Sequence, residues 1–422
     1  MRFLKIFPGE SLVVAFSFIY FFLILASYYI LRPIRDEIGA SGGVENLPWL
    51  FLGTLAVTIV ISPIFSTVVA KLPRRRVAAA SYRLMIAFLL VFFWLLRNPD
   101  SSVYPWAARA FFVWLSIFNI FVVSVFWTVM SDVFRTDQAR RLYGLIGSGG
   151  TLGGLCGGLI TSSLVGLVGT VSLLLVSAVL LEGALQCMFA MTKNAAAHAE
   201  SQSRIDSKPV GGSAFAGLTR VAKSPYLMSI ALFMLLFTVG STFLYFLQAQ
   251  IVASEIPDRA GRTAFFAHVD IWVNVLTLIT QLGITGRLLT SFGIAGGLVV
   301  MPALSILGFA WLGIAPTLVV VITFQVLRRA GNFAITTPAR ESLYIPLPRE
   351  DKYKSKNLID TSMFRTGDQI GAWSSAALLS FGLGIRGIAL AAIALSCAWL
   401  IGAIWLGRKH ARELQKDQPS LS

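Results

Sequence analysis

The chain contains twelve stretches of apolar residues, each long enough to cross a lipid bilayer as a helix. About 20 residues at about 1.5 Å per residue span the roughly 30 Å hydrocarbon core. Hydrophobic residues make up 56% of the chain and charged residues 13%, whereas soluble domains carry about 25% charged residues. We therefore predict an all-α membrane protein whose twelve transmembrane helices lie at residues 11–31, 47–70, 77–97, 106–130, 143–167, 170–191, 226–248, 264–285, 292–313, 315–337, 358–381 and 386–407.

The charge distribution predicts the orientation of these helices. The chain has 35 Lys and Arg against 20 Asp and Glu, a net charge of +15. Most of the basic residues fall in alternate loops, and the positive-inside rule places such loops in the cytoplasm. An even number of helices then puts both termini in the cytoplasm. This bias accounts for most of the positive charge, so we expect no nucleic-acid partner.

The predicted helices divide into two sets of six. Residues 1–191 form an N-terminal half and residues 225–422 a C-terminal half, and residues 192–224 read as a polar cytoplasmic linker. The second helix of each half is followed by a basic loop, VAKLPRRR and GITGRLLTSFG respectively. Both loops resemble the basic, glycine-containing loop of the major facilitator superfamily. The resemblance implies a major facilitator fold, and transporters built from such repeats bind substrate near the bilayer midplane.

Charged side chains inside the apolar stretches point to a transport path. A charge at the centre of a bilayer costs roughly 2.5–3.5 kcal/mol on insertion scales, so such charges usually face a watery cavity or one another. The densest group lies between Arg328 and Trp373. We interpret this region as the lining and the cytoplasmic gate of the path.

The candidate site residues are polar or charged and lie in or next to predicted helices. Those expected to contact an anionic substrate are Arg32, Arg35, Asn119, Tyr245, Gln325, Arg328, Arg329, Asn332 and Arg365. Those expected to act in gating or coupling are Asp36, Gln138, Asp270, Arg340, Lys352, Lys354, Asp360 and Asp368. A structural alternative stays open for two groups: Arg32 and Arg35 would lie at the membrane interface with local ion pairs, and Arg365 with Asp368, three residues apart, would form a stabilising intrahelical pair.

A run of glycines, GLIGSGGTLGGLCGGLI, follows the fourth predicted helix. A phosphate-binding loop needs Lys followed by Ser or Thr after its glycines, and these are missing here. Instead, Gly149, Gly153 and Gly157 recur every fourth residue. This spacing predicts close packing of two membrane helices.

Three segments carry a resemblance to a known family. They are RPIRDEIG, TDQARRLYG and ARESLYIPLPREDKYKSKNLIDTSMFRTGDQIGAW, and with them the chain resembles the ADP/ATP translocases of plastids and intracellular bacteria. The resemblance implies nucleotide exchange across a bacterial inner membrane. Lysines of the family correspond to Arg35 and Arg340, which keep the positive charge, and a family acidic residue corresponds to Gln138. The lost charge at Gln138 leaves another anionic substrate open.

Together these features predict a secondary active transporter that exchanges anionic, phosphorylated solutes of the ATP/ADP type. The alternative is a proton-coupled major facilitator transporter of another small solute, with Asp270, Asp360 or Asp368 taking up the proton. Neither a catalytic triad order nor a metal-ligand cluster is present in the sequence, so we expect no enzyme activity, no cofactor and no bound metal. The expected partners are an anionic small molecule and the lipid bilayer, and we expect a monomer.

Overall fold

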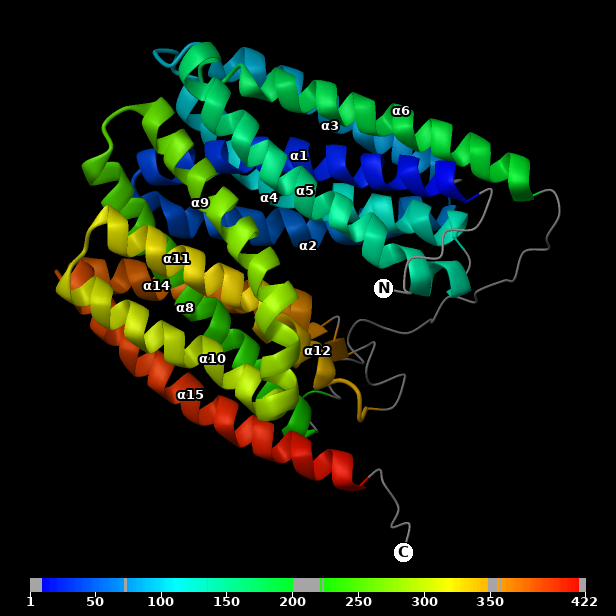
Figure 1. Ribbon diagram of the computed structural model, residues 1–422. Helices are drawn as coiled ribbons and strands as arrows, with labels where there is room; N and C mark the ends of the chain where they lie inside the picture. The colour runs from blue at the N-terminus through cyan, green and yellow to red at the C-terminus, as the bar shows by residue number, and fades with distance from the viewer. Residues whose placement is uncertain are drawn as a thin grey trace, which may run out of the picture. The chain divides into compact units, whose positions relative to one another are not determined.

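The structure is a computed structural model, and it describes residues 10–71, 74–134, 136–199, 221, 224–347, 355–356 and 358–416. The regular elements of these residues are all helical (Figure 1). Most of the predicted linker, residues 200–220 and 222–223, lies outside the described part of the chain, as do Lys352 and Lys354.

The helices follow one another with short connections. They are α1 (Ser11–Ser41), η1 (Val44–Asn46), α2 (Leu47–Lys71), α3 (Arg74–Leu96), α4 (Tyr104–Val133), α5 (Thr136–Val168), α6 (Leu173–Ala199), α8 (Pro225–Glu255), α9 (Arg259–Thr280), η2 (Gln281–Thr285), α10 (Gly286–Ile314), α11 (Leu318–Gly331), η3 (Asn332–Thr336), α12 (Thr337–Ser342), η4 (Ile359–Met363), α14 (Phe364–Ser380) and α15 (Ile385–Lys416). The segments η2, η3 and η4 are single π-helical turns.

Ten helices among the described residues are long and apolar enough to cross a membrane. One of them, Arg259–Ile314, contains two of the predicted spans and is broken at Gly293, whose φ is 66°. The predicted span 358–381 is the π turn η4 followed by α14, which has only 17 residues. An all-helical membrane fold is therefore confirmed, and the count of twelve stays a prediction.

Several helices extend beyond the predicted apolar spans. Helix α1 continues to Ser41, ten residues past its predicted end at 31, and includes Arg32, Arg35 and Pro33. The prediction was based on hydrophobicity, and the apolar stretch ends at the first arginine, Arg32. The helix continues because backbone N–H and C=O groups near lipid must be satisfied within the helix, and because the two arginines contact a carboxylate on the same helix.

The described chain forms two compact units. Unit 1 comprises Met1–Gly42, Leu52–Ser207 and Ile256–Ile271. Within it, α1 packs against α4, α5 and α6 (Figure 1). The hydroxyl groups of Tyr20 and Tyr82 are 2.6 Å apart, and both side chains are fully buried. Tyr82 also donates to the carbonyl oxygen of Val122 at 3.2 Å, so Tyr20 donates to Tyr82 and both buried hydroxyl protons have an acceptor.

The predicted glycine packing is confirmed in unit 1. A Cβ at Gly149 would lie 2.6 Å from the carbonyl oxygen of Phe18, and one at Gly157 would lie 2.6 Å from that of Ala26. A Cβ at Gly153 would collide with the carbonyl oxygen of Phe22. The stripe on α5 therefore lies directly against the backbone of α1, and only glycine fits there.

This contact predicts a large effect of one substitution. Gly153→Val is expected to destabilise the protein by about 2–3 kcal/mol, because the added atoms meet backbone that cannot rotate away. The measurement is the thermal unfolding midpoint in detergent. Gly147→Val on the same helix is the matched control, since nothing lies within 4 Å of a Cβ there. Equal midpoints for the two variants would show that α1 and α5 are not in this register.

Unit 2 comprises Gly43–Phe51, Lys208–Glu255 and Trp272–Ser422. Helix α8 packs against α14 and α15, and α10 packs against α11 and α15 (Figure 1). Trp399 of α15 is 1% exposed and contacts Phe233 and Phe237 of α8. Aromatic packing of this kind holds α8 in the interior of the unit.

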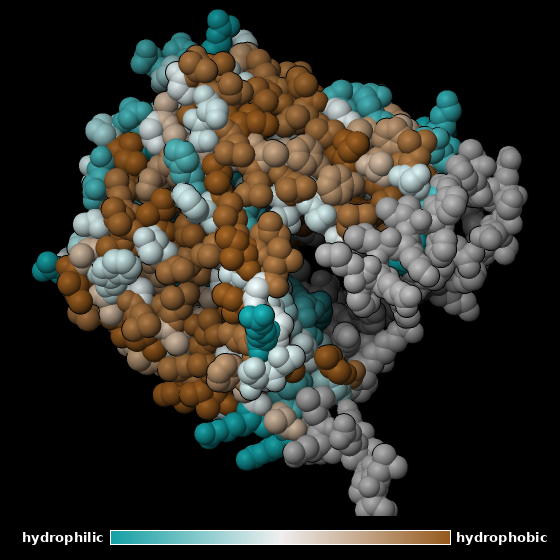
Figure 2. Space-filling model, in the orientation of Figure 1, coloured by the Kyte–Doolittle hydropathy of each residue, from teal (hydrophilic) through white to brown (hydrophobic). Residues whose placement is uncertain are grey.

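Large apolar side chains cover much of the outer surface, and Figure 2 shows hydrophobic residues over most of the visible face. Trp94 is 73% exposed, Leu167 and Leu282 are each 82% exposed, and Phe292 is 73% exposed. Contiguous apolar surface of this kind is rare on proteins that face water. It is the surface expected of helices that contact lipid.

Candidate functional site

In unit 1, the C-terminal part of α1 carries a buried cluster of charges. Nη1 of Arg32 lies 3.3 Å from Oδ1 of Asp270, a side chain that α9 contributes. Nη2 of Arg35 lies 2.7 Å from Oδ1 of Asp36, and Nε of Arg32 lies 3.8 Å from Oδ2 of Asp36. The predicted residues Arg32, Arg35, Asp36 and Asp270 therefore come together. Each arginine contacts a carboxylate, so binding of a phosphate here would require the arginines to exchange partners.

A second carboxylate of α1 was missed by the sequence reasoning as a site residue. Glu37 is 1% exposed, and its two oxygens accept hydrogen bonds from Nε of Arg259 at 3.1 Å and from Nη2 of Arg262 at 3.0 Å. Both arginines lie between the predicted spans 226–248 and 264–285. Their spacing of three residues places them on one helical face, and this was the signal that could have identified them.

In unit 2, Arg328 of α11 is 3% exposed and has an unusual set of partners. Its Nη1 donates to Oγ of Ser241 at 2.7 Å, its Nε donates to Oγ of Ser305 at 3.1 Å, and its Nη2 donates to the carbonyl oxygen of Phe237 at 3.1 Å. The guanidinium carbon also lies 5.2 Å from the centre of the Phe237 ring.

All of these partners are neutral. No carboxylate among the described residues forms an ion pair with Arg328. A buried guanidinium without a counter-charge is costly, because burial removes its hydration and nothing of opposite sign replaces it. The arrangement holds a positive charge ready for an anion.

The other predicted substrate-contacting residues of unit 2 lie on neighbouring helices. Gln325 and Arg329 are half-buried on α11, and Asn332 is half-buried at the start of the π turn η3. Tyr245 is half-buried on α8, with its ring centre 5.8 Å from that of Phe51. Single π turns often occur at functional positions, and η3 directly follows the helix that carries Arg328. Asn119 belongs to unit 1, where it is half-buried on α4.

The predicted ion pair on α14 is present. Nη1 of Arg365 lies 3.5 Å from Oδ2 of Asp368, and Thr242 of α8 donates to Oδ1 of Asp368 at 3.3 Å. Asp368 is 7% exposed. Unlike Arg328, therefore, Arg365 has a carboxylate partner in the structure.

A further charged group lies around α12. Nη2 of Arg340 is 3.8 Å from Oδ1 of Asp360, and Lys356 pairs with Glu341. Tyr344, which follows α12, is fully buried. Burial, and after it the negative charge of Asp360, raises the pKa of the Tyr344 hydroxyl above its ordinary value, so this group stays neutral. The predicted gating residues Arg340 and Asp360 are thus in contact.

A family model described as TLC ATP/ADP transporter matches residues 101–410, well over half of the chain. The chain belongs to the TLC ATP/ADP transporter family. The predicted resemblance is thereby confirmed, and because this is a family of transporters, the chain is not an enzyme.

Curated relatives cover nearly the whole chain. ADP,ATP carrier protein 1 of Chlamydia trachomatis is 23% identical over 93% of this chain and 87% of its own length. The carrier of the same name from Chlamydia pneumoniae is 22% identical over 95% of this chain and 92% of its own length.

Solved structures with a similar fold are transporters. A bacterial homologue of the iron transporter ferroportin, in an inward-facing state, aligns with a TM-score of 0.67 at 12% identity and covers 95% of this chain and 99% of its own. The nucleoside transporter NupG aligns with a TM-score of 0.61 at 14% identity and covers 94% of this chain and all of its own. At these identities the similarity concerns the fold alone.

Gln138, where the resemblance implied an acidic residue, has a clear local structure. Gln138 of α5 donates from Nε2 to Oε1 of Glu10 at 2.9 Å, and Arg141 donates to both oxygens of Glu10 at 2.8 and 2.9 Å. An acidic residue at position 138 would repel Glu10. The neutral amide of Gln138 can instead donate a hydrogen bond to the carboxylate of Glu10.

Proposed function

We propose that this chain is a secondary active transporter that exchanges adenine nucleotides, ATP against ADP, across the bacterial inner membrane. Both termini would lie in the cytoplasm, and twelve transmembrane helices would form two halves, residues 1–191 and 225–422, joined by the linker 192–224. Membership of the TLC ATP/ADP transporter family and the names of the chlamydial relatives support the substrate class.

The observation that carries this proposal is the buried charge of Arg328. Its neutral partners, Ser241, Ser305 and the Phe237 carbonyl, orient the guanidinium group without cancelling its charge. A phosphate oxygen can take the place of a hydroxyl and add the missing negative charge, and such charge-assisted hydrogen bonds are roughly twice as strong as neutral ones. A nucleotide polyphosphate supplies several such oxygens.

The same charge favours exchange over one-way transport. An empty carrier holds a buried cation that no carboxylate in the described part of the structure neutralises, which makes a closed, substrate-free state costly. A bound polyphosphate lowers that cost in both directions of transport. In this scheme Arg328, Arg329, Gln325, Asn332 and Tyr245 contact substrate from unit 2, with Arg365 available once it leaves Asp368.

Arg32, Arg35 and Asn119 are the substrate-contacting candidates of unit 1. Asp36, Asp270 and Asp368 would act as exchangeable partners that hold the arginines while substrate is absent. Arg340 and Asp360, together with Lys352 and Lys354, would form the cytoplasmic gate, and Gln138 would assist it. Breaking and re-forming these pairs would couple the binding of substrate to the change of conformation.

Counterflow in proteoliposomes tests the proposal. Vesicles preloaded with ADP should take up labelled ATP from outside, and vesicles without internal nucleotide should not. If the protein were instead a proton-coupled transporter, empty vesicles would accumulate substrate when a pH gradient is imposed. Absence of nucleotide counterflow in folded protein would contradict the proposal, whichever substrate the pH gradient drives.

A further inference from the structure

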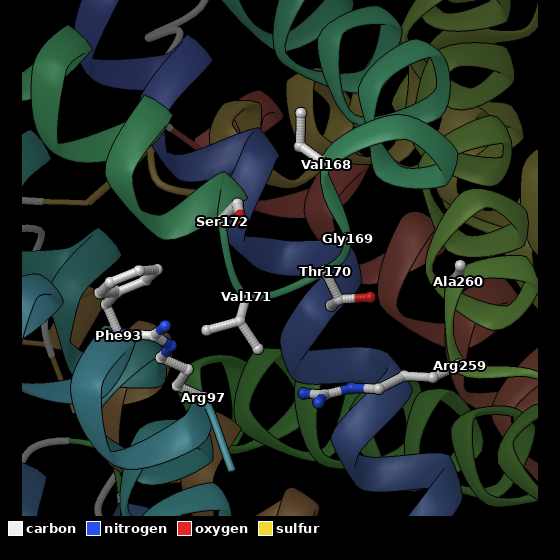
Figure 3. A pocket seen from close by; sticks show the side chains of 9 residues that line it. All are labelled: Phe93, Arg97, Val168, Gly169, Thr170, Val171, Ser172, Arg259 and Ala260. Carbon is white, nitrogen blue, oxygen red and sulfur yellow. The ribbon is translucent and has the colours of Figure 1, made fainter. Parts of the chain in front are cut away.

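Unit 1 contains a cavity that the proposed transport path does not use. Its volume is about 390 Å³, and it opens at the turn that joins α5 to α6. Residues 168–172 of this turn form one wall, Phe93 and Arg97 at the end of α3 form a second, and Arg259 with Ala260 at the start of α9 forms a third (Figure 3). The proposed topology places this end of the helices outside the cytoplasm.

Two arginines face the cavity. In Figure 3 the guanidinium group of Arg259 extends from α9 toward Arg97. Thr170 and Val171 lie nearby on the turn that joins α5 to α6. Arg97 is exposed and has no hydrogen-bond or ion-pair partner among the described residues. The cavity therefore presents two cationic groups from helices that are distant in the sequence.

One nitrogen of Arg259 is buried without a partner. Its Nε donates to Glu37 and its guanidinium carbon lies 5.5 Å from the centre of the Tyr104 ring, but its Nη2 is shielded from solvent and has no hydrogen-bond acceptor in the described part of the chain. Glu37 is shared with Arg262, so one carboxylate serves two arginines. A buried guanidinium N–H without an acceptor costs free energy. A rotation of the guanidinium group toward the cavity would let a bound anion provide that acceptor.

Polar and apolar walls complete the site. Thr170 is 6% exposed, and its hydroxyl lies 3.5 Å from that of Thr263, while Phe93 and Val171 offer apolar surface. Two guanidinium groups with a hydroxyl suit a phosphate group, because arginine binds phosphate oxygens in a bidentate manner.

We propose that this cavity is a second anion site, separate from Arg328, that binds the phosphate groups of a nucleotide outside the cytoplasm before transport. The identity of the nucleotide rests on the proposed function. The recognition of a phosphate group does not rest on the proposed function. The headgroup of an anionic phospholipid also carries a phosphate group. The two sources are separated by experiment.

The test uses a thiol placed in the wall of the cavity. Full-length Val171→Cys protein is reconstituted in phosphatidylcholine vesicles, and mass spectrometry measures the rate at which position 171 reacts with a maleimide. Pyrophosphate or ADP should slow this reaction at least about threefold, and adenosine should not. Adding Arg97→Gln should raise the half-protective concentration about tenfold, the effect of losing one charge-assisted hydrogen bond.

Two matched variants guard the interpretation. Arg109→Gln removes an arginine that lies over the ring of Trp106 on α4 and does not line the cavity, and protection should be unchanged. Arg328→Gln removes the proposed transport site, and protection should again persist. Loss of protection in Arg328→Gln would mean that the signal comes from the transport cycle, which would overturn the proposal.

The remaining outcomes separate the sources and the two proposals. Protection by vesicles that contain phosphatidylglycerol, without soluble anion, would support the phosphate site and assign it to lipid. If no phosphate compound slows the maleimide reaction, or if adenosine slows it equally, the proposed phosphate site is wrong. Counterflow measured in the same vesicles reports separately on the proposed function, so exchange without protection would remove only the cavity proposal.

Discussion

Arg328→Gln is expected to reduce the rate of ATP/ADP exchange about 100-fold and to leave the unfolding temperature unchanged or higher. The loss of exchange corresponds to about 2.7 kcal/mol, in the range of one hydrogen bond to a charged group. The stability should not fall, because the buried wild-type charge has only neutral partners within the described ranges of the chain. Removing such a charge relieves a desolvation cost of several kcal/mol, which offsets the three charge-assisted hydrogen bonds lost, at about 1.5 kcal/mol or more each.

This combination separates a functional arginine from a structural one. Arg365→Gln is the control for stability: it removes the ion-pair partner of Asp368, which is 7% exposed, so its unfolding temperature should fall. Arg83→Gln is the control for transport, since Arg83 is an exposed side chain on α3 and exchange should persist. Counterflow and thermal unfolding are measured on the same preparations. Wild-type exchange rates in Arg328→Gln would remove this residue from the site.

Glu37→Gln is expected to lower the stability of the protein by about 3–5 kcal/mol, the usual effect of removing one partner from a buried ion pair. The wild-type carboxylate is 1% exposed and holds two arginines, Arg259 and Arg262. The neutral amide of Gln at this position leaves Arg259 and Arg262 without the carboxylate that balances their charge. The measurement is the shift in the thermal unfolding midpoint, which should be the largest among single substitutions of acidic residues in α1 and its neighbours.

A second substitution tests the cause. In the double variant Glu37→Gln with Arg262→Gln, one of the two uncompensated cations is removed, so the double variant should be more stable than Glu37→Gln alone. Glu45→Gln, an exposed acid just beyond α1, should change stability by less than about 0.5 kcal/mol. If the losses of stability caused by Glu37→Gln and Arg262→Gln simply added in the double variant, the charge of Arg262 would not be stabilised by Glu37.

Features that depend on neighbouring residues in the chain were predictable from sequence. The apolar stretches identify the helical membrane fold because their length matches the bilayer. The glycine repeat predicted the packing of α5, and the spacing of Arg365 and Asp368 predicted their ion pair. The helix ends were predicted poorly, since hydrophobicity marks where a helix meets lipid rather than where its hydrogen bonds stop.

The partners of the buried charges depended on contacts between distant segments. Glu37 meets Arg259 and Arg262 across 222 and 225 residues of chain. Ser241 lies 87 residues from Arg328 in the sequence and accepts a hydrogen bond from it. Spacing along one helix says which face a charge occupies but not which helix covers that face.

The sequence by itself therefore determined that this protein is a helical membrane protein with charges inside its apolar segments, because hydrophobicity and helical periodicity are local properties. Only the tertiary structure decided which of those charges are neutralised, as Arg365 is by Asp368, and which meet only neutral groups among the described residues, as Arg328 does. The physical reason is that the free energy of a buried ion depends on the groups within a few ångströms of it, and the packing of whole helices brings those groups together.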